Sequence, residues 1–286
     1  MSHFYPLNYT KSPLKDNGYI DENGKIQKEK FENDKKTLSL PGVKQQDQKN
    51  AFKYLVQVYT LCERFIREIN ATRKTNHPNI MRILDAQLIK DPAFYVAEYI
   101  SGRTLDEFIR QQGPIPLKQA LAVLNLSING LQAVQANGVI HRDLKPANIM
   151  LTPGSSLVKI IDFGIARNLD MPQGELTQGA IIGTLSYLPP EIHNAGEAQG
   201  LDHKGDIFML AITLYEMLTG GKLPHDIQDI RQHFAWSQST LPTFPDMSNI
   251  PSEAQGLLKR MGEKNPHIRI NYPEIQQEIL RILRTR

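Results

Sequence analysis

The sequence of 286 residues is poor in cysteine and contains no long hydrophobic run. Its single cysteine, Cys62, excludes an internal disulfide and a cysteine-based zinc finger, and such low usage agrees with a reducing compartment. No stretch approaches the roughly 18 consecutive apolar residues of a membrane-spanning helix, and the N-terminus shows no signal-peptide pattern. Neither sign of charge dominates, because 33 Lys and Arg face 30 Asp and Glu, and a net charge of +3 disfavours nucleic acid as a partner. We therefore expect a cytoplasmic protein with no membrane span.

Several common catalytic signatures are missing as well. The sequence has no HExxH pair of zinc ligands, no GxSxG turn of a serine hydrolase and no GxxxxGK[ST] phosphate loop. Its eight histidines are scattered without the paired spacing of metal ligands. These absences disfavour a zinc hydrolase, an α/β-hydrolase and a P-loop nucleotide hydrolase.

Apolar residues are also scarce at the N-terminus. They make up 13 of the first 50 residues, against 40% of the whole chain. Asn17-Gly18 and Asn23-Gly24 are turn signals within this region. We therefore expect residues 1–36 to form a polar N-terminal extension and residues 37–286 to form the folded domain.

Periodic patterns divide the rest of the chain into a strand-rich part and a helix-rich part. Apolar clusters predict short antiparallel strands within 37–56 and at 80–87 and 94–100. Helical spacing predicts one early helix at about 58–75. Later helices are expected at about 104–112, 117–138, 205–220, 226–236, 252–262 and 273–284. Strands first and helices afterwards predict an α+β protein with a small β-rich lobe and a larger α-helical lobe.

Two short polar motifs carry the chemistry. Residues 141–148 read HRDLKPAN, and DFG follows at 162–164, fourteen residues after Asn148. Together they resemble the catalytic loop and the magnesium motif of the protein kinase family. Asp, Asn, Pro and Gly also favour ordinary turns, but both motifs in this order and at this spacing disfavour that interpretation. The resemblance implies a bilobal kinase fold, with an N-lobe at about 37–99 and a C-lobe at about 100–286.

The kinase resemblance also implies a role for each motif residue. Phosphoryl transfer from ATP needs a carboxylate that accepts the hydroxyl proton, oxygen ligands for Mg²⁺ and a cation near the developing charge. By the resemblance Asp143 is the catalytic base, Asn148 and Asp162 hold Mg²⁺, and Lys145 meets the γ-phosphate. An Asn and an Asp suit Mg²⁺, which keeps few protein ligands beside phosphates and waters. The expected cofactors are ATP and Mg²⁺, with Mn²⁺ as an alternative metal.

The segment after the second motif resembles the end of a kinase activation segment. Residues 183–191 read GTLSYLPPE, and small-molecule kinases with a related core usually lack this segment, so a protein substrate is favoured over a small-molecule phosphotransferase. By the same resemblance Asp206 hydrogen-bonds the catalytic-loop backbone, and Arg269 forms an ion pair with Glu191. Surface charge is the alternative for Asp206 and Arg269. Because a buried carboxylate is costly unless hydrogen-bonded, we expect a structural role for Asp206.

Upstream, the resemblance points to residues that bind ATP. Lys53, in the sequence AFK, matches the strand lysine that reaches the α- and β-phosphates. Glu68, nine residues before HPNI at 77–80, matches its helix partner, although Glu63 is a competing candidate and surface charge is the alternative for each. Ala97 aligns with the back of the adenine pocket, where its small side chain predicts room for bulky inhibitors. The other ATP-binding residues that the resemblance implies are Val43, Ala51, Glu98, Tyr99 and Met150.

The glycine-rich GxGxxG loop of the family is missing. Only Gly42 falls in the window before Lys53 where that loop is expected. Two outcomes stay open: a minimal Pro-Gly turn covers ATP at a cost in nucleotide affinity, or the protein is a pseudokinase that acts as a scaffold. The lysine, glutamate, base and metal ligands together favour an active kinase, because a scaffold needs none of them.

Details of the motifs resemble bacterial-type Ser/Thr protein kinases. Lys145 and Thr184 are typical of Ser/Thr-specific enzymes rather than tyrosine kinases. Such enzymes phosphorylate their own activation loop, and Thr177 matches one modified position, with an ordinary loop threonine as the alternative. Arg142 is the partner that such a phosphate needs, because phosphate and guanidinium form a bidentate pair. We expect autophosphorylation at Thr177, and a homodimer in which one copy acts on the other.

Overall fold

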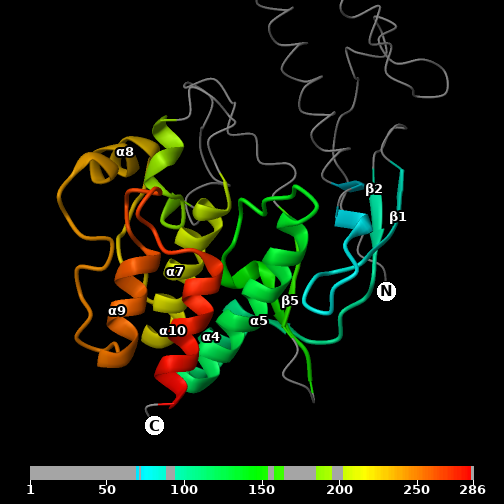
Figure 1. Ribbon diagram of the computed structural model, residues 1–286, viewed down its shortest axis with the longest axis horizontal. Coiled ribbons are helices and arrows are strands. Elements are labelled where there is room, and N and C mark those ends of the chain that lie inside the picture. The colour runs from blue at the N-terminus through cyan, green and yellow to red at the C-terminus, as the bar shows by residue number, and fades with distance from the viewer. Residues whose placement is uncertain are drawn as a thin grey trace, which may run out of the picture. The chain divides into compact units, whose positions relative to one another are not determined.

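The computed structural model describes residues 69–70, 72–87, 94–153, 158–163, 185–194 and 202–284. These residues belong to two compact units (Figure 1). One unit contains the described residues up to Arg73 and Arg82–Tyr99, and the other contains Lys74–Met81 and the described residues from Ile100 onward. Residues 74–81 thus group with the second unit, although they precede Arg82–Tyr99 in the sequence.

In the first unit two strands form an antiparallel hairpin. β1 (Ile83–Gln87) pairs with β2 (Phe94–Ala97), and Ile83 lies opposite Ala97. The sequence predicts both strands, and each is shorter than its apolar run. The strands expected within 37–56 lie outside the described residues. Of the helix expected at 58–75, residues 69–70 and 72–75 are described, and all of them except Thr75 are helical.

The second unit contains a three-stranded sheet that the sequence pattern does not predict. β3 (Arg103–Thr104), β4 (Ile149–Leu151) and β5 (Val158–Ile160) pair antiparallel in the order β3-β4-β5. Ile80 forms a parallel bridge with Ile160, which explains why residues 74–81 belong to this unit. Strands of two or three residues are too short for an alternating pattern to identify.

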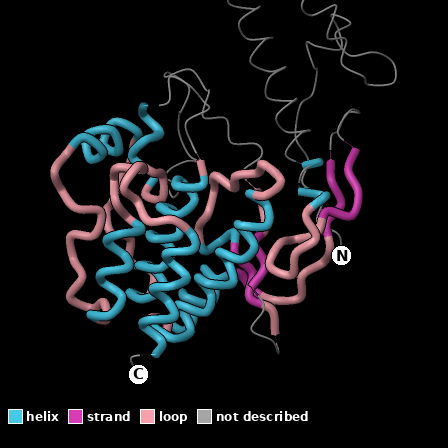
Figure 2. The backbone as a smooth tube through the Cα atoms, in the orientation of Figure 1, coloured by secondary structure: helices cyan, strands magenta, loops and turns pink. Residues whose placement is uncertain are grey.

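Six α-helices form the framework of the second unit within the described residues (Figure 2). They are α4 (Leu105–Gln112), α5 (Leu117–Gln135), α7 (His203–Thr219), α8 (Ile230–Gln238), α9 (Ser252–Met261) and α10 (Tyr272–Arg284). Two short 3-10 helices, η1 (Pro146–Asn148) and η2 (Pro190–Asn194), complete the set. The clearest difference from the predicted bounds is at α8. This helix begins at Ile230 rather than 226, because the Asp229 side chain accepts from the backbone N–H groups of Arg231 and Gln232.

Helix α7 lies at the centre of this unit. Every residue from Gly205 to Leu218 is buried, and α7 packs against α5 and α9, between which it runs in Figure 1. A helix that is buried on all sides has no exposed face for charged groups. The two carboxylates it carries, Asp206 and Glu216, must therefore find partners inside the protein.

Two glycines permit close backbone approaches around this core. At Gly130, on α5, a Cβ atom would lie 2.9 Å from Cδ1 of Ile80 and 3.0 Å from the carbonyl oxygen of Asn79. Glycine therefore lets α5 pack directly against the segment that pairs with β5. Gly220 ends α7 with a φ of 72°, the left-handed conformation that favours glycine at helix C-termini.

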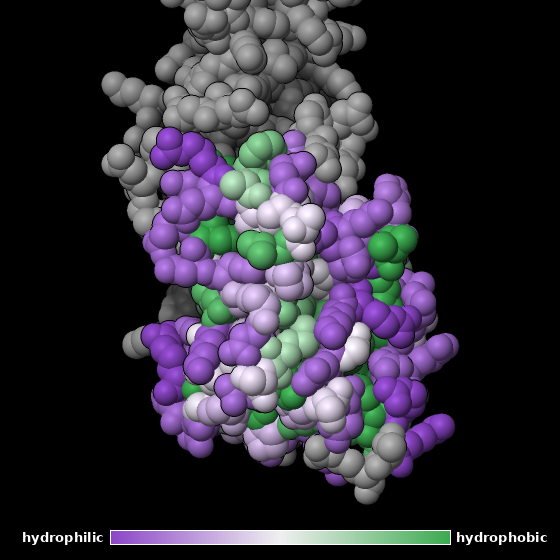
Figure 3. All heavy atoms as spheres, turned by 90° about the vertical axis from the view of Figure 1, so that its left-hand side faces the viewer, coloured by the Kyte–Doolittle hydropathy of each residue, from purple (hydrophilic) through white to green (hydrophobic). Residues whose placement is uncertain are grey.

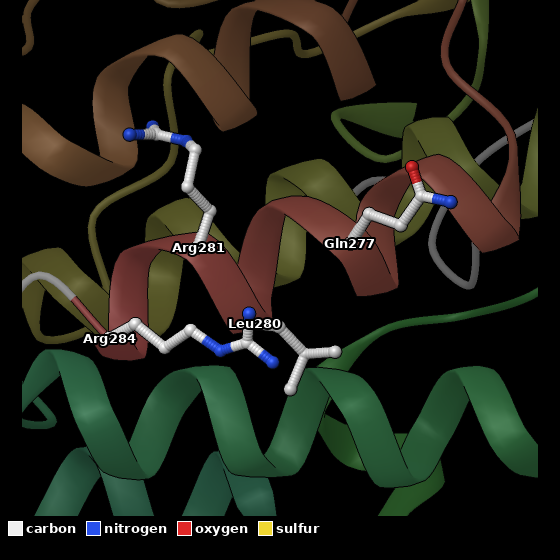
Figure 4. Close-up of a pocket in the computed structure, with 4 residues that line it drawn as sticks. All are labelled: Gln277, Leu280, Arg281 and Arg284. Atoms are coloured by element: carbon white, nitrogen blue, oxygen red, sulfur yellow. The ribbon is translucent and has the colours of Figure 1, made fainter.

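The surface of the helical unit is mostly hydrophilic on the face shown in Figure 3, with apolar side chains scattered over it. A hollow of about 460 Å³ lies on α10, lined by Gln277, Leu280, Arg281 and Arg284 (Figure 4). Arg281 there forms an ion pair with Glu278 at 2.6 Å. This hollow contains none of the motif residues.

No helix in the described part of the chain is long and apolar enough to cross a membrane.

Candidate active site

The small sheet brings the two sequence motifs together. β4 begins directly after Asn148, and β5 ends two residues before Asp162. The antiparallel register places Ile149 opposite Ile160, and the Ile161 N–H donates to the Asn148 carbonyl at 3.0 Å. Asn148 and Asp162 therefore flank adjacent ends of neighbouring strands.

Asp143 is held in one orientation on the loop before β4. Asn148 Nδ2 donates to the Asp143 carbonyl at 2.7 Å and to its carboxylate Oδ2 at 2.8 Å. Lys145 Nζ lies 3.3 Å from the same Oδ2. The Asp143 side chain is 10% exposed. A fixed carboxylate beside a cation is the arrangement that proton acceptance and charge stabilisation require.

Asn148 and Asp162 fit a Mg²⁺ site. Because the amide nitrogen of Asn148 makes both hydrogen bonds to Asp143, the amide oxygen is the side-chain atom left for a cation. Amide and carboxylate oxygens are ligands that Mg²⁺ prefers. Among the described residues no group of three or more His, Cys, Asp or Glu is suited to a metal. A cation held by Asn148 and Asp162 would therefore need further oxygen ligands from phosphates or water.

His141 connects the two motifs, a role that the sequence reasoning does not assign to it. This side chain is fully buried. Its Nδ1 accepts from the Asp143 N–H at 3.3 Å, so Nε2 carries the proton and donates to the Ile161 carbonyl at 3.0 Å. The imidazole also lies 4.7 Å from the ring of Phe163. A neutral histidine thus ties the catalytic loop to the strand end that precedes Asp162.

Asp206, in the first turn of α7, fixes the backbone of the catalytic loop. Its Oδ2 accepts from the His141 N–H at 2.9 Å, and its Oδ1 accepts from the Arg142 N–H at 2.8 Å. These are the contacts that the kinase resemblance implies. Burial raises the pKa of Asp206 to about 6, although both hydrogen bonds oppose that shift.

Arg142 and Asp162 have backbone φ values of 65° and 50°, a conformation that is strained for residues other than glycine.

A buried ion pair joins η2 to the loop before α10. Arg269 is 1% exposed, and its two terminal nitrogens donate to the Glu191 carboxylate at 2.6 and 2.9 Å. The remaining guanidinium N–H groups donate to the carbonyls of Lys204, Glu263 and Lys264. All five donors therefore have acceptors, as a buried guanidinium requires.

A second buried polar pair, Tyr187 and Glu216, is not predicted from the sequence. The Tyr187 hydroxyl donates to the Glu216 carboxylate at 2.5 Å. Burial raises the pKa of Glu216 to about 7; the Tyr187 hydrogen bond opposes this shift, and the charge of Asp106 adds to it. Burial likewise raises the pKa of Tyr187. The pair forms because the segment that precedes η2 packs against α7. No local sequence pattern could therefore have predicted it.

Replacing Glu216 by glutamine is expected to raise the melting temperature at pH 8 but not at pH 5.5. The pKa of Glu216 is higher in the folded than in the unfolded protein. The contribution of this carboxyl group to the free energy of unfolding therefore falls as the pH rises from about 4.5 through 7. Glutamine keeps an acceptor for Tyr187 without the buried charge. We expect a gain of about 2–4 °C at pH 8 by calorimetry. Glu278→Gln, which removes a partner of Arg281, should give no gain. An equal gain from Glu216→Gln at both pH values would contradict the charge-based explanation.

The other predicted site residues divide between the units. Ala97 ends β2, and Glu98 and Tyr99 follow it in the first unit. Glu98 Oε1 accepts from the Arg82 N–H at 2.8 Å, and Tyr99 is exposed. Met150 lies in β4 of the second unit and is half-buried. Six predicted residues lie outside the described part of the chain: Val43, Ala51, Lys53, Glu68, Thr177 and Thr184.

Comparison with known proteins identifies a family model and several similar kinases. A family model described as the protein kinase domain matches residues 23–280, and so begins before residue 37. The serine/threonine-protein kinase PknB of Mycobacterium tuberculosis is 38% identical over 162 residues, which cover 55% of this chain and 25% of that protein. PknB of Mycobacterium leprae is 32% identical over 227 residues, covering 77% and 36%. The serine/threonine-protein kinase pkn3 of Myxococcus xanthus is 36% identical over 166 residues, covering 55% and 29%. The chain thus spans between 25% and 36% of the length of these three relatives.

Proposed function

This chain belongs to the protein kinase family, and we therefore propose that it is a bacterial-type Ser/Thr protein kinase. It transfers the γ-phosphate of ATP to serine and threonine hydroxyls of proteins. The observation that supports this activity most directly is the arrangement of the catalytic loop. Asn148 and Lys145 orient Asp143, and the sheet register brings Asn148 beside the strand end that leads to Asp162. A scaffold would need none of these contacts.

Each residue of the loop has a separate task in the transfer. Asp143 accepts the proton of the substrate hydroxyl as that oxygen attacks the γ-phosphorus. The new O–P bond forms while the bond from the γ-phosphorus to the bridging oxygen breaks, and ADP leaves with that electron pair. Lys145, 3.3 Å from Asp143, offsets the negative charge of the phosphoryl group. Asn148 and Asp162 would hold Mg²⁺ or Mn²⁺ through their side-chain oxygens, and the cation would supply positive charge that offsets the phosphate charge.

The kinase resemblance supplies the proposed nucleotide-binding residues. We assign Lys53, paired with Glu68, to the α- and β-phosphates, as the kinase resemblance implies. Ala97 lies at the back of the adenine site and leaves room for bulky inhibitors. The remaining contacts to ATP are assigned to Val43, Ala51, Glu98, Tyr99 and Met150.

The enzyme is further proposed to phosphorylate its own activation loop. Thr177 is the acceptor, Thr184 belongs to the same loop, and a homodimer lets one copy act on the other. Arg142 supports this regulation, because it adjoins Asp143 and its backbone N–H is held by Asp206. A phosphothreonine that pairs with this guanidinium would order the loop beside the catalytic base.

Protein substrates, ATP and a second copy of the chain are the proposed partners. A net charge of +3 gives no support for nucleic acid as a partner, and one cysteine in 286 residues suits a cytoplasmic location.

Transfer of labelled phosphate from Mg-ATP to the chain itself and to a basic acceptor protein tests this activity. We expect label on serine and threonine, including Thr177, none on tyrosine, and loss of all transfer when EDTA removes the metal. An absence of transfer by protein that still binds ATP would favour the pseudokinase scaffold. An active enzyme whose loop stays unmodified would remove Thr177 as an acceptor.

A further inference from the structure

The segment from Leu185 to Glu191 is attached to the helical core at several points. Besides the two buried polar pairs of Tyr187 and Glu191, the Ser186 hydroxyl donates to the His225 carbonyl at 3.2 Å. Tyr187 also lies within electrostatic range of Asp143. Hydrogen bonds therefore anchor this segment to the helical core near the catalytic base.

Two histidines provide one further attachment. His233, on α8, is fully buried, and its Nε2 lies 2.9 Å from the carbonyl oxygen of Leu188. Its Nδ1 lies 2.6 Å from Nε2 of His193, on η2. Because a carbonyl only accepts, Nε2 of His233 carries a proton, so Nδ1 of the neutral ring accepts from His193. The two imidazoles thus form a relay of two hydrogen bonds that ends on the backbone of Leu188.

The relay is built to persist at neutral pH. Protonation of His193 at Nδ1 would not break the hydrogen bond between the two rings, because His193 donates through Nε2. Protonation of His233 at Nδ1 would break it, because Nδ1 is the acceptor. Burial lowers the pKa of His233 to about 4; the Leu188 hydrogen bond opposes this shift, and the charges of His193 and Lys264 add to it. Lys264 is the nearby cation, with Nζ 4.4 Å from the Trp236 ring that packs on His233. His225 packs on the same tryptophan, and burial lowers the pKa of His225 and of His193 as well.

Resting on the proposed kinase function, we propose that His233, oriented by His193, is a positioning residue for the protein substrate. It fixes the carbonyl of Leu188, and with it the backbone beside Tyr187. Because Tyr187 lies near Asp143, we place the peptide chain next to the phosphorylated hydroxyl along this backbone. Within the described part of the chain, the relay ends on Leu188 and makes no hydrogen bond to Asp143. Its loss should therefore weaken the binding of peptide without slowing the chemical step.

Two substitutions at one position separate this role from simple packing. His233→Leu removes both hydrogen bonds, whereas His233→Gln keeps a side-chain N–H and a carbonyl oxygen. With a degenerate peptide mixture centred on serine or threonine, we expect His233→Leu to raise the KM for peptide about tenfold. The kcat and the KM for ATP should stay within about twofold of wild type. His233→Gln should restore the KM for peptide to within about threefold.

The exposed His267 provides a matched control, and His267→Gln should leave all three constants unchanged. If His233→Leu fails to fold, His193→Phe removes the donor at a half-buried position and is expected to raise the KM for peptide about threefold. Equal losses in His233→Gln and His233→Leu would overturn the positioning role. A lower kcat, or a higher KM for ATP, with an unchanged KM for peptide would overturn it as well.

Hydrogen exchange distinguishes a failure of this role from a failure of the kinase function. If the wild-type protein transfers no phosphate, the kinase function fails, but the amides of residues 186–188 still report the relay. His233→Leu should speed their exchange about tenfold, whereas His233→Gln and His267→Gln should not. Unchanged exchange in His233→Leu would show that the relay does not hold this segment.

Discussion

The Asp143→Asn variant is expected to lose phosphate transfer by a factor of about 10²–10⁴ while it keeps its fold, since general-base catalysis contributes a factor of this size. Asparagine has nearly the same shape, and its side-chain oxygen can still accept from Asn148, which donates to Oδ2 at 2.8 Å in the wild type. It cannot accept the proton of the substrate hydroxyl. The measurement is kcat with labelled ATP, and the KM for ATP should change by less than about threefold.

A matched control separates loss of the base from loss of a carboxylate in general. Asp85, on β1, has a side chain that is 73% exposed, and Asp85→Asn should keep full activity. The melting temperatures of both variants should match that of the wild type. Equal transfer by the wild type and Asp143→Asn would contradict the assignment and would indicate a contaminating kinase.

The Glu191→Ala variant is expected to lower the free energy of unfolding by about 3–5 kcal/mol, because it leaves the Arg269 guanidinium buried without its counter-ion. Arg269 is 1% exposed, so water cannot replace the lost carboxylate. Arg269→Lys should also destabilise the protein, since an ammonium cannot serve the five acceptors that surround the guanidinium. Urea denaturation, followed by circular dichroism, measures both losses.

An ion pair on the surface provides the comparison. Glu278 pairs with Arg281 at 2.6 Å, but the arginine side chain is 62% exposed. Glu278→Ala should therefore cost at most about 1 kcal/mol. If Glu191→Ala costs no more than Glu278→Ala, the buried pair does not stabilise the junction of η2 with the loop before α10.

Long periodic elements and contiguous motifs could be predicted from the sequence. The apolar periodicity of α5 and α10 extends over three or more turns, so their positions follow from local pattern alone. The catalytic-loop residues were identifiable because their types and spacing recur as a unit. Asp206 and Arg269 were found in the same way, through the short motifs in which they lie, and both make the contacts that the resemblance implies.

Other features depended on contacts that no local pattern carries. β3, β4 and β5 have two or three residues each, and pairing rather than propensity defines them. In the sequence Gly130 looks like any glycine within a helix. In the structure its lack of a side chain lets the segment at Asn79 pack closely against α5. His141 was part of a recognised motif, but its hydrogen bonds to Asp143 and to Ile161, the residue before the second motif, became apparent only from the fold.

By itself the sequence determined the family, the helical framework and the candidate catalytic and metal-binding residues. Only the tertiary structure decided which buried polar groups meet. Glu216 joins Tyr187, 29 residues away, and His233 joins His193, 40 residues away. A period of 2 or 3.6 residues reports which face of an element is apolar. It says nothing of the partner that a single polar side chain on that face must find, because that partner is supplied by whichever distant segment packs against it.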